Sequence, residues 1–220
     1  MRLRILAWLI AAASAFIAVS QAAAQLTARE EIVRIPTSGA TIVATVMRPP
    51  GEDKRPLAII NHGSPADSAQ RPNMDRPRYP SLSSWFVSRG YVVVLPMRRG
   101  YGESGGTWAE NYGSCQTPDY FSAGLQGAAD IKAAMDYMRS QPYVAADRTI
   151  VIGQSAGGWA TVAFSSLNPP GVPGMVNFAG GRATLKALGP YGSDGHTMAA
   201  NSAGVPMWSG PVAEFLASLK

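Results

Sequence analysis

A serine with a glycine two positions away on either side is the part of this sequence with the clearest chemical meaning. Gly153, Ser155 and Gly157 follow a β-branched run at 149–152 and precede a helix-like stretch at 159–167. A strand, G-x-S-x-G and a helix in this order are typical of a sharp turn that exposes the serine hydroxyl above a sheet. The pattern predicts covalent attack by Ser155 on an acyl carbonyl.

A second motif offers donors for the negative charge that such an attack creates. The sequence N-H-G-S-P at 61–65 directly follows a short apolar run at 57–60. In sites of this kind one amide comes from the residue after the nucleophile and another from the loop after an earlier strand. We therefore expect an oxyanion hole built from Ala156 and from Gly63 or Ser64.

The candidates for the general base are few, because the chain contains only two histidines, His62 and His196. His196 follows Ser155, in a glycine-flanked loop, and the chain order nucleophile, acid, histidine is an established one. His196 is thus the predicted base, with a solvated loop histidine as the alternative. His62 belongs to the predicted oxyanion loop, where we expect it to shape the pocket and help to bind substrate.

Four motifs together resemble the α/β-hydrolase family. They are N-H-G-S-P at 61–65, R-R-G-Y-G-E-S-G-G at 98–106, G-Q-S-A-G-G at 153–158 and D-G-H-T at 194–197. The resemblance is to the dienelactone-hydrolase-like and prolyl-oligopeptidase-like (S9) branch, and it covers residues 31–183. It implies a serine, histidine and acid triad with no metal or organic cofactor. Dienelactone hydrolases carry a cysteine where this chain has Ser155, so their reaction is not implied.

The acid of that triad is not evident. Only Asp194 and Glu214 follow Ser155 as acidic residues. Asp194 is a weak candidate, because residues two apart in an extended segment point the same way without converging on the Nδ1 of His196. The stretch from Ser155 to His196 is roughly half as long as the resemblance implies. We expect an internal deletion after Gly181, with its junction at about 182–190; the alternative is a compact natural variant with the acid elsewhere.

Strand and helix patterns alternate along the chain and predict an α/β fold. We expect a mostly parallel sheet that begins with an antiparallel hairpin at 32–35 and 41–47 and is truncated in its C-terminal part. Helices should cover both faces of the sheet. Further strands are expected at 57–60, at 91–95 up to Pro96, at 149–152 and at 175–178. Helices are expected at 80–89, from Asp119 to a stop before Pro142, at 159–167 and at 211–219.

The N-terminus has the three parts of a secretory signal peptide. Arg2 and Arg4 precede an apolar stretch at 5–19, and alanines at 22–24 supply a cleavage site. The apolar stretch is shorter than a membrane span requires. We expect cleavage after residue 24, no stable membrane span afterwards, a periplasmic or secreted location, and a single domain at 25–220.

Charge and cysteine content give weaker guidance. The net charge is +5, and five arginines lie in two loops, at 71, 76, 78, 98 and 99. We favour a solvated loop surface for them over a polyanion site, and no motif for nucleic-acid binding is present. Cys115 is the only cysteine, so it is either a buried small apolar residue or a thiol whose partner has been lost from the chain.

These observations favour an exported serine hydrolase that cleaves an ester-type bond in a small-molecule ester or amide. Tyr101 and Trp108 are expected to bind substrate, and the loops at 72–80 and 101–118 to line the pocket. Two alternatives remain open: an S9-like serine peptidase, and a catalytically silent, truncated hydrolase fold. The oligomeric state is left open.

Overall fold

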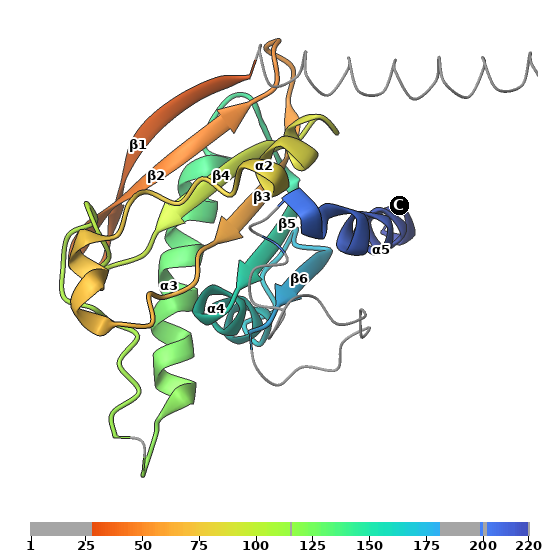
Figure 1. The fold of residues 1–220 in the computed structure, drawn as a ribbon. Helices are drawn as coiled ribbons and strands as arrows, with labels where there is room; N and C mark the ends of the chain where they lie inside the picture. The colour runs from red at the N-terminus through yellow and green to blue at the C-terminus, as the bar shows by residue number, and fades with distance from the viewer. Residues whose placement is uncertain (1–27, 115, 181–198, 200–201, 220) are drawn as a thin grey trace, which may run out of the picture.

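A single six-stranded sheet organises the chain. The computed structural model describes residues 28–114, 116–180, 199 and 202–219 (Figure 1). The strand order is β1-β2-β4-β3-β5-β6. Their bounds are β1 Arg29–Thr37, β2 Ala40–Arg48, β3 Arg55–Asn61, β4 Val92–Met97, β5 Val144–Gln154 and β6 Gly174–Phe178.

The pairing of these strands confirms the predicted α/β-hydrolase sheet. β1 and β2 form an antiparallel hairpin through a turn at Gly39, whose φ of 98° favours glycine. β2 also pairs antiparallel with β4, whereas the pairs β3–β4, β3–β5 and β5–β6 are parallel. Because the carboxyl ends of parallel strands share one edge, the loops after β3, β4, β5 and β6 lie on the same side of the sheet.

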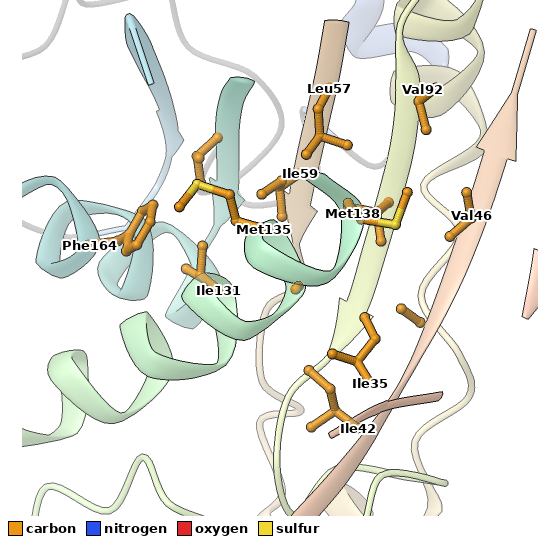
Figure 2. Packing of buried hydrophobic residues seen from close by; sticks show 14 of the residues in the cluster. Ile35, Ile42, Val46, Leu57, Ile59, Val92, Ile131, Met135, Met138 and Phe164 are labelled. Atoms are coloured by element: carbon orange, nitrogen blue, oxygen red, sulfur yellow. The ribbon is translucent and has the colours of Figure 1, made fainter. Parts of the chain in front are cut away.

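Two apolar cores form, one on each face of the sheet. α3 (Tyr120–Arg139) and α4 (Ala156–Ser165) pack on one face, where Ile131 and Phe164 are buried (Figure 2). α2 (Pro80–Val87) and α5 (Val205–Ser218) pack on the other, with Trp208 buried. Short 3₁₀ turns occupy Ser68–Asn73 (η1) and Ser202–Gly204 (η2). Alternate residues of each strand supply the two cores, so continuous apolar runs are needed in the central strands.

The long helix α3 has the start and the buried stripe that the sequence predicts. The Asp119 carboxylate caps the helix by accepting a hydrogen bond from the Ser122 amide at 2.9 Å. Its buried apolar residues recur at three and four positions and face the sheet and α4. A Cβ at Gly127 would lie 2.7 Å from the Cβ of Ala160, so glycine allows the close approach of the two helices.

Two proline assignments were wrong. Pro96 does not end β4 but lies inside it, opposite Ala44 of β2. The pairing of β4 with β3 extends only to Val94, so Pro96 has a strand neighbour on one side only. A sheet tolerates a proline, which lacks the N–H, at such an edge position. α5 begins at Val205 rather than at Pro211, which lies within the helix and costs it one backbone hydrogen bond. Burial of Trp208 and Val212 against the sheet compensates.

Several predictions concern segments outside the described residues. These are the signal peptide at 1–24, Cys115, the deletion junction at 182–190, and the histidine loop with Asp194 and His196. Among the helices that the structure describes, none combines the length and apolar character that a membrane crossing demands.

Candidate active site

Ser155 occupies a strained turn between β5 and α4. Its φ of 53° and ψ of −121° are unusual for a residue with a side chain, and backbone strain of this kind is common at active sites. The turn is fixed from both sides: the Ser155 amide donates to the Phe178 carbonyl at 2.9 Å, and its carbonyl accepts from the Trp159 amide at 3.0 Å. The strand, turn and helix predicted from the sequence are therefore present.

The two glycines of the motif are required by close backbone approaches. A Cβ at Gly153 would lie 2.2 Å from the carbonyl oxygen of Gly157. A Cβ at Gly157 would lie 2.4 Å from the carbonyl oxygens of Asn61 and His62, at the end of β3. Such distances exclude any side chain. The serine turn therefore rests directly on the loop that was predicted to hold the oxyanion.

Gly63 is the point at which the two motifs meet. A Cβ at Gly63 would lie 3.2 Å from the Cβ of Ser155 and 2.5 Å from the Oε1 of Gln154. The Gly63 amide donates to the Tyr79 hydroxyl at 3.2 Å, and that hydroxyl donates to the Gln154 Oε1 at 2.9 Å. Tyr79 thus connects the loop after β3 to the residue before Ser155. Its burial raises the pKa of the phenol, which stays protonated and able to donate.

The contact with Tyr79 distinguishes Gly63 from Ser64, the two residues of the loop after β3 that were predicted as oxyanion donors. The Gly63 amide is engaged by Tyr79, whereas the amides of Ser64 and Ala156 donate to no other described residue. Of the pair named from the sequence, Ser64 is therefore the one whose N–H remains available beside Ser155. The oxyanion role of Ser64, Gly63 and Ala156 stays a prediction.

His62 is buried behind the pocket and is not part of its lining. Only 2% of the residue is exposed. Its Nε2 accepts a hydrogen bond from the Arg98 amide at 3.1 Å, and its Nδ1 lies 2.7 Å from the Gly63 carbonyl, to which it donates as the neutral Nδ1–H tautomer. Burial, and then the nearby Arg98 guanidinium, hold the pKa of the imidazole well below its usual value. Because both ring nitrogens are engaged in hydrogen bonds, His62 supports the loop rather than contacting substrate. This corrects the prediction that His62 helps to bind substrate.

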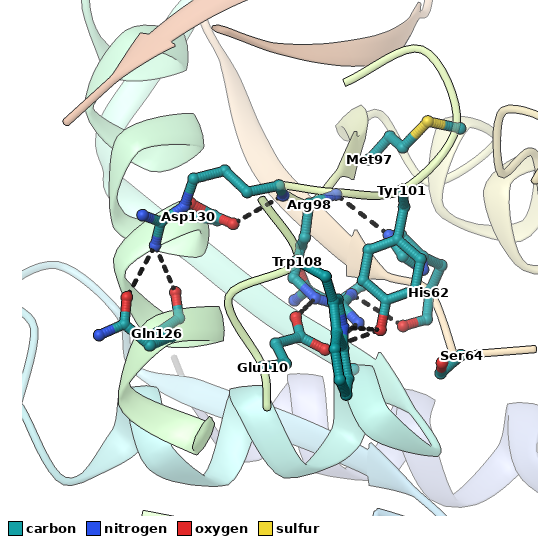
Figure 3. Close-up of polar contacts among 12 residues, drawn as sticks. His62, Ser64, Met97, Arg98, Tyr101, Trp108, Glu110, Gln126 and Asp130 are labelled. Atoms are coloured by element: carbon teal, nitrogen blue, oxygen red, sulfur yellow. Dashed lines mark hydrogen bonds and ion pairs between the residues drawn. The ribbon is translucent and has the colours of Figure 1, made fainter. Parts of the chain in front are cut away.

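A buried ion pair lies beneath the same loop. Arg98 is fully buried and donates to both carboxylate oxygens of Glu110 and, at 2.8 Å, to the His62 carbonyl (Figure 3). The Tyr101 hydroxyl donates to Glu110 at 3.0 Å and accepts from the indole N–H of Trp108 at 3.1 Å. The loops after β3 and β4 are therefore joined by one continuous polar network.

The burial of two arginines corrects part of one interpretation of the sequence. A solvated loop surface was favoured for all five arginines of the cluster, and Arg78 is exposed, yet Arg98 is buried and only 13% of the Arg99 side chain is exposed. Arg99 pairs with Asp130 of α3 at 2.7 Å. The two residues hold the loop after β4 against its neighbours, because a buried guanidinium needs a carboxylate partner.

A pocket with a volume of about 520 Å³ opens beside Ser155. Tyr101 and Trp108 line it as predicted, but residues 72–80 do not. The lining includes the polar residues Ser64, Arg71 and Glu110, and the rings of Tyr112, Tyr120 and Trp159 form an aromatic wall. The three rings are in contact: the centroids of Tyr112 and Tyr120 are 5.1 Å apart and those of Tyr120 and Trp159 6.5 Å apart. A ligand bound there would contact both polar and apolar side chains.

Sequence reasoning missed Arg71, Tyr79, Glu110 and Gln154. Only Gln154 carried a local signal, as the residue inside the elbow motif that precedes the nucleophile. Arg71 and Tyr79 come from the long loop after β3, and no spacing rule links them to Ser155. The predicted His196 and Asp194 lie outside the described residues, and within the described part no cluster of His, Cys, Asp or Glu could hold a metal ion.

Comparison with known proteins connects this geometry to a family. Residues 77–170 match the family model of the prolyl oligopeptidase family, Peptidase_S9. The structure is similar to Porphyromonas gingivalis dipeptidyl peptidase 4, with a TM-score of 0.52 and 20% identity over 69% of this chain and 20% of that one. It is also similar to the α/β hydrolase GrgF from Penicillium sp. sh18, with a TM-score of 0.51 and 20% identity over 67% and 45%.

The chain has the α/β-hydrolase fold. Its sequence is also 29% identical to dipeptidyl-peptidase 5 of P. gingivalis over 127 residues, which are 56% of this chain and 17% of that protein. The resemblance to α/β hydrolases of the S9 branch is thereby confirmed. The chain spans less than half the length of each of these three proteins.

Proposed function

We propose that this α/β-hydrolase chain is a serine hydrolase that forms an acyl-enzyme on Ser155. The observation that carries the proposal is the position of Ser155: it lies on a strained strand-to-helix turn, in the lining of the pocket and in contact with the loop after β3. This arrangement presents a hydroxyl to a bound carbonyl and surrounds it with backbone amides.

The proposed reaction has two stages. Ser155 Oγ attacks the carbonyl carbon of the substrate while its proton passes to His196, and the amides of Ala156 and Ser64 stabilise the oxyanion. The leaving group takes the proton from His196, and water then repeats the sequence to release the acid and regenerate the serine. Asp194 is the candidate acid nearest to His196 in sequence.

We infer that an ester is cleaved in preference to an amide. An amine is a poor leaving group unless histidine protonates it, whereas an alcohol leaves more easily. Histidine depends on its carboxylate for orientation, and loss of that acid can cost about 10⁴ in turnover. Since Asp194 is a weak acid candidate, the proposed site is better suited to the less demanding ester reaction.

A serine peptidase is the second candidate. The matches to the prolyl oligopeptidase family and to dipeptidyl-peptidase 5 favour it. Comparison of Ser155-dependent rates on a short-chain aryl ester and on a dipeptide anilide decides between the two: higher kcat/KM on the ester supports the first candidate, and higher kcat/KM on the anilide the second.

Reaction with a fluorophosphonate, read by intact mass, tests the nucleophile itself. We expect one adduct on the folded protein, none on Ser155→Ala, and an unchanged adduct on Ser165→Ala, which removes an exposed hydroxyl from α4. A folded protein without an adduct would support the catalytically silent alternative. The same spectrum tests the proposed export, because cleavage of a signal peptide would leave the mass of residues 25–220.

A further inference from the structure

Among the described residues that line the Ser155 pocket, Arg71 is the one with a cationic side chain. It belongs to the 3₁₀ turn η1, in the loop after β3. Its guanidinium lies over the Trp108 ring, with the central carbon 3.5 Å from the ring centroid. Its Nε donates to the Ser64 hydroxyl at 3.3 Å. The side chain is thus held in place by a stacking contact and a hydrogen bond rather than by an opposite charge.

The charge of Arg71 is not neutralised by any described carboxylate. Arg76 pairs with Glu103 and Arg78 with Glu30, whereas Arg71 makes no ion pair with a described residue. Glu110, the one acid among the described lining residues, already receives hydrogen bonds from Arg98 and Tyr101. The described part of the pocket therefore carries one uncompensated positive charge.

The contacts of Arg71 leave its terminal donors without a described partner, in a residue that lines the pocket. Its two terminal nitrogens donate to no described residue, and a planar guanidinium offers them as a fork that matches the two oxygens of a carboxylate. Ser64, to which Arg71 is bonded, follows Gly63, and Gly63 adjoins Ser155. An anionic group bound at Arg71 would therefore lie in the same cavity as the reacting carbonyl, and the aromatic wall would cover an apolar chain between them.

We propose that Arg71 is a substrate-binding residue and that the pocket selects acyl compounds that carry a second, free carboxylate. This proposal rests on the proposed serine hydrolase for its identification of the reacting group. Arg71 takes no part in the covalent steps; it orients the substrate by binding its carboxylate. A charge-assisted contact of this kind discriminates between an anion and its neutral analogue by about tenfold or more.

Binding to the Ser155→Ala protein tests the proposal without requiring turnover. The probes are monoethyl adipate and its neutral counterpart ethyl hexanoate, and binding is measured by isothermal titration. We expect monoethyl adipate to bind at least about tenfold more tightly, and Arg71→Gln to abolish that preference. Arg71→Lys should retain part of it, and Arg76→Gln, which removes an arginine already paired outside the pocket, should retain all of it.

Three results would overturn the proposal: equal affinity for the two esters, no binding of monoethyl adipate at millimolar concentration, or an equal loss of both affinities in Arg71→Gln. The outcome is independent of the fluorophosphonate test. A preference for the anion on a protein that forms no Ser155 adduct would refute the hydrolase and retain the anion site, and an adduct without the preference would do the reverse.

Discussion

The carboxyl ends of β4 and β6 both border the site, but they are held in different ways. After β4, the buried polar groups are paired: Arg98 bonds to Glu110 and to the His62 carbonyl. Near the end of β6, the Asn177 amide group is buried with neither its oxygen nor its nitrogen bonded to a described residue. On that side β6 is held by its parallel pairing with β5, by the backbone bond from Ser155 to Phe178 and by apolar packing of Phe178 on Trp208.

The difference shows where the geometry around Ser155 is determined. A polar network fixes directions as well as distances, because each donor must meet its acceptor, whereas apolar packing fixes only distances. The loops between residues 61 and 110 therefore position the predicted oxyanion donors accurately. On the β6 side the directional constraints are those of the backbone, through the pairing with β5 and the bond from Ser155 to Phe178, and the Asn177 side chain adds none with a described residue.

The largest effect on this contrast is expected from the removal of Arg98. Arg98→Met leaves the Glu110 carboxylate buried without its cation, and we expect the free energy of unfolding to fall by about 3–5 kcal/mol. Urea titration followed by circular dichroism measures the change. Arg29→Met is the matched control, because it breaks the exposed pair with Glu52 and should cost less than about 1 kcal/mol. Equal effects of the two variants would show that the network does not hold the loops.

The same contrast explains which parts of the molecule could be predicted from the sequence. The serine turn is a local pattern: its strand, its glycines and its helix lie within about twenty residues, and the structure contains all of them. The burial of Arg98 could not be predicted in this way. Its partners His62 and Glu110 come from two different loops, and their meeting depends on the order of β3 and β4 in the sheet.

The errors in the element boundaries have a similar origin. Pro96 and Pro211 were assigned to a strand end and a helix start by their local preferences. Pro96 lies inside β4 because β3 pairs only as far as Val94, and Pro211 lies inside α5 because the helix buries Trp208 and Val212. In both cases a tertiary contact outweighs the cost of one missing N–H.

A smaller effect is expected at the bridge between the two motifs. Tyr79→Phe removes the hydroxyl that accepts from Gly63 and donates to Gln154, and it leaves both groups without this partner. We expect a loss of about 1–2 kcal/mol in unfolding free energy and slower labelling of Ser155 by the fluorophosphonate. Tyr91→Phe is the control, since the Tyr91 hydroxyl bonds to no described residue. If both variants label at the wild-type rate, Tyr79 does not position the loop.

The neutral state of His62 predicts a dependence of stability on pH. Its pKa is lower in the folded protein than in the unfolded chain, so the unfolded chain binds more protons below about pH 6.5. The contribution of neutral His62 to the free energy of unfolding is complete above that pH and is lost as the pH falls. We expect the free energy of unfolding to fall by about 1 kcal/mol between pH 7.0 and 5.5. His62→Gln should remove this slope. A slope that survives in His62→Gln would assign it to another group.

The smallest effect, and one of opposite sign, is expected on the β6 side. Asn177→Leu replaces a buried amide that has no described partner with an apolar group of similar size, so we expect no loss and up to about 1 kcal/mol of gain in unfolding free energy. Asn61→Leu is the matched comparison at the end of β3: its Oδ1 has no described partner, but its Nδ2 donates to the Ile152 carbonyl at 3.0 Å and to the Thr161 hydroxyl at 3.2 Å, and the loss of these two bonds should cost about 1–3 kcal/mol. A loss above about 1 kcal/mol in Asn177→Leu would show that the amide has a partner of its own, and the two sides of the site would then be held alike.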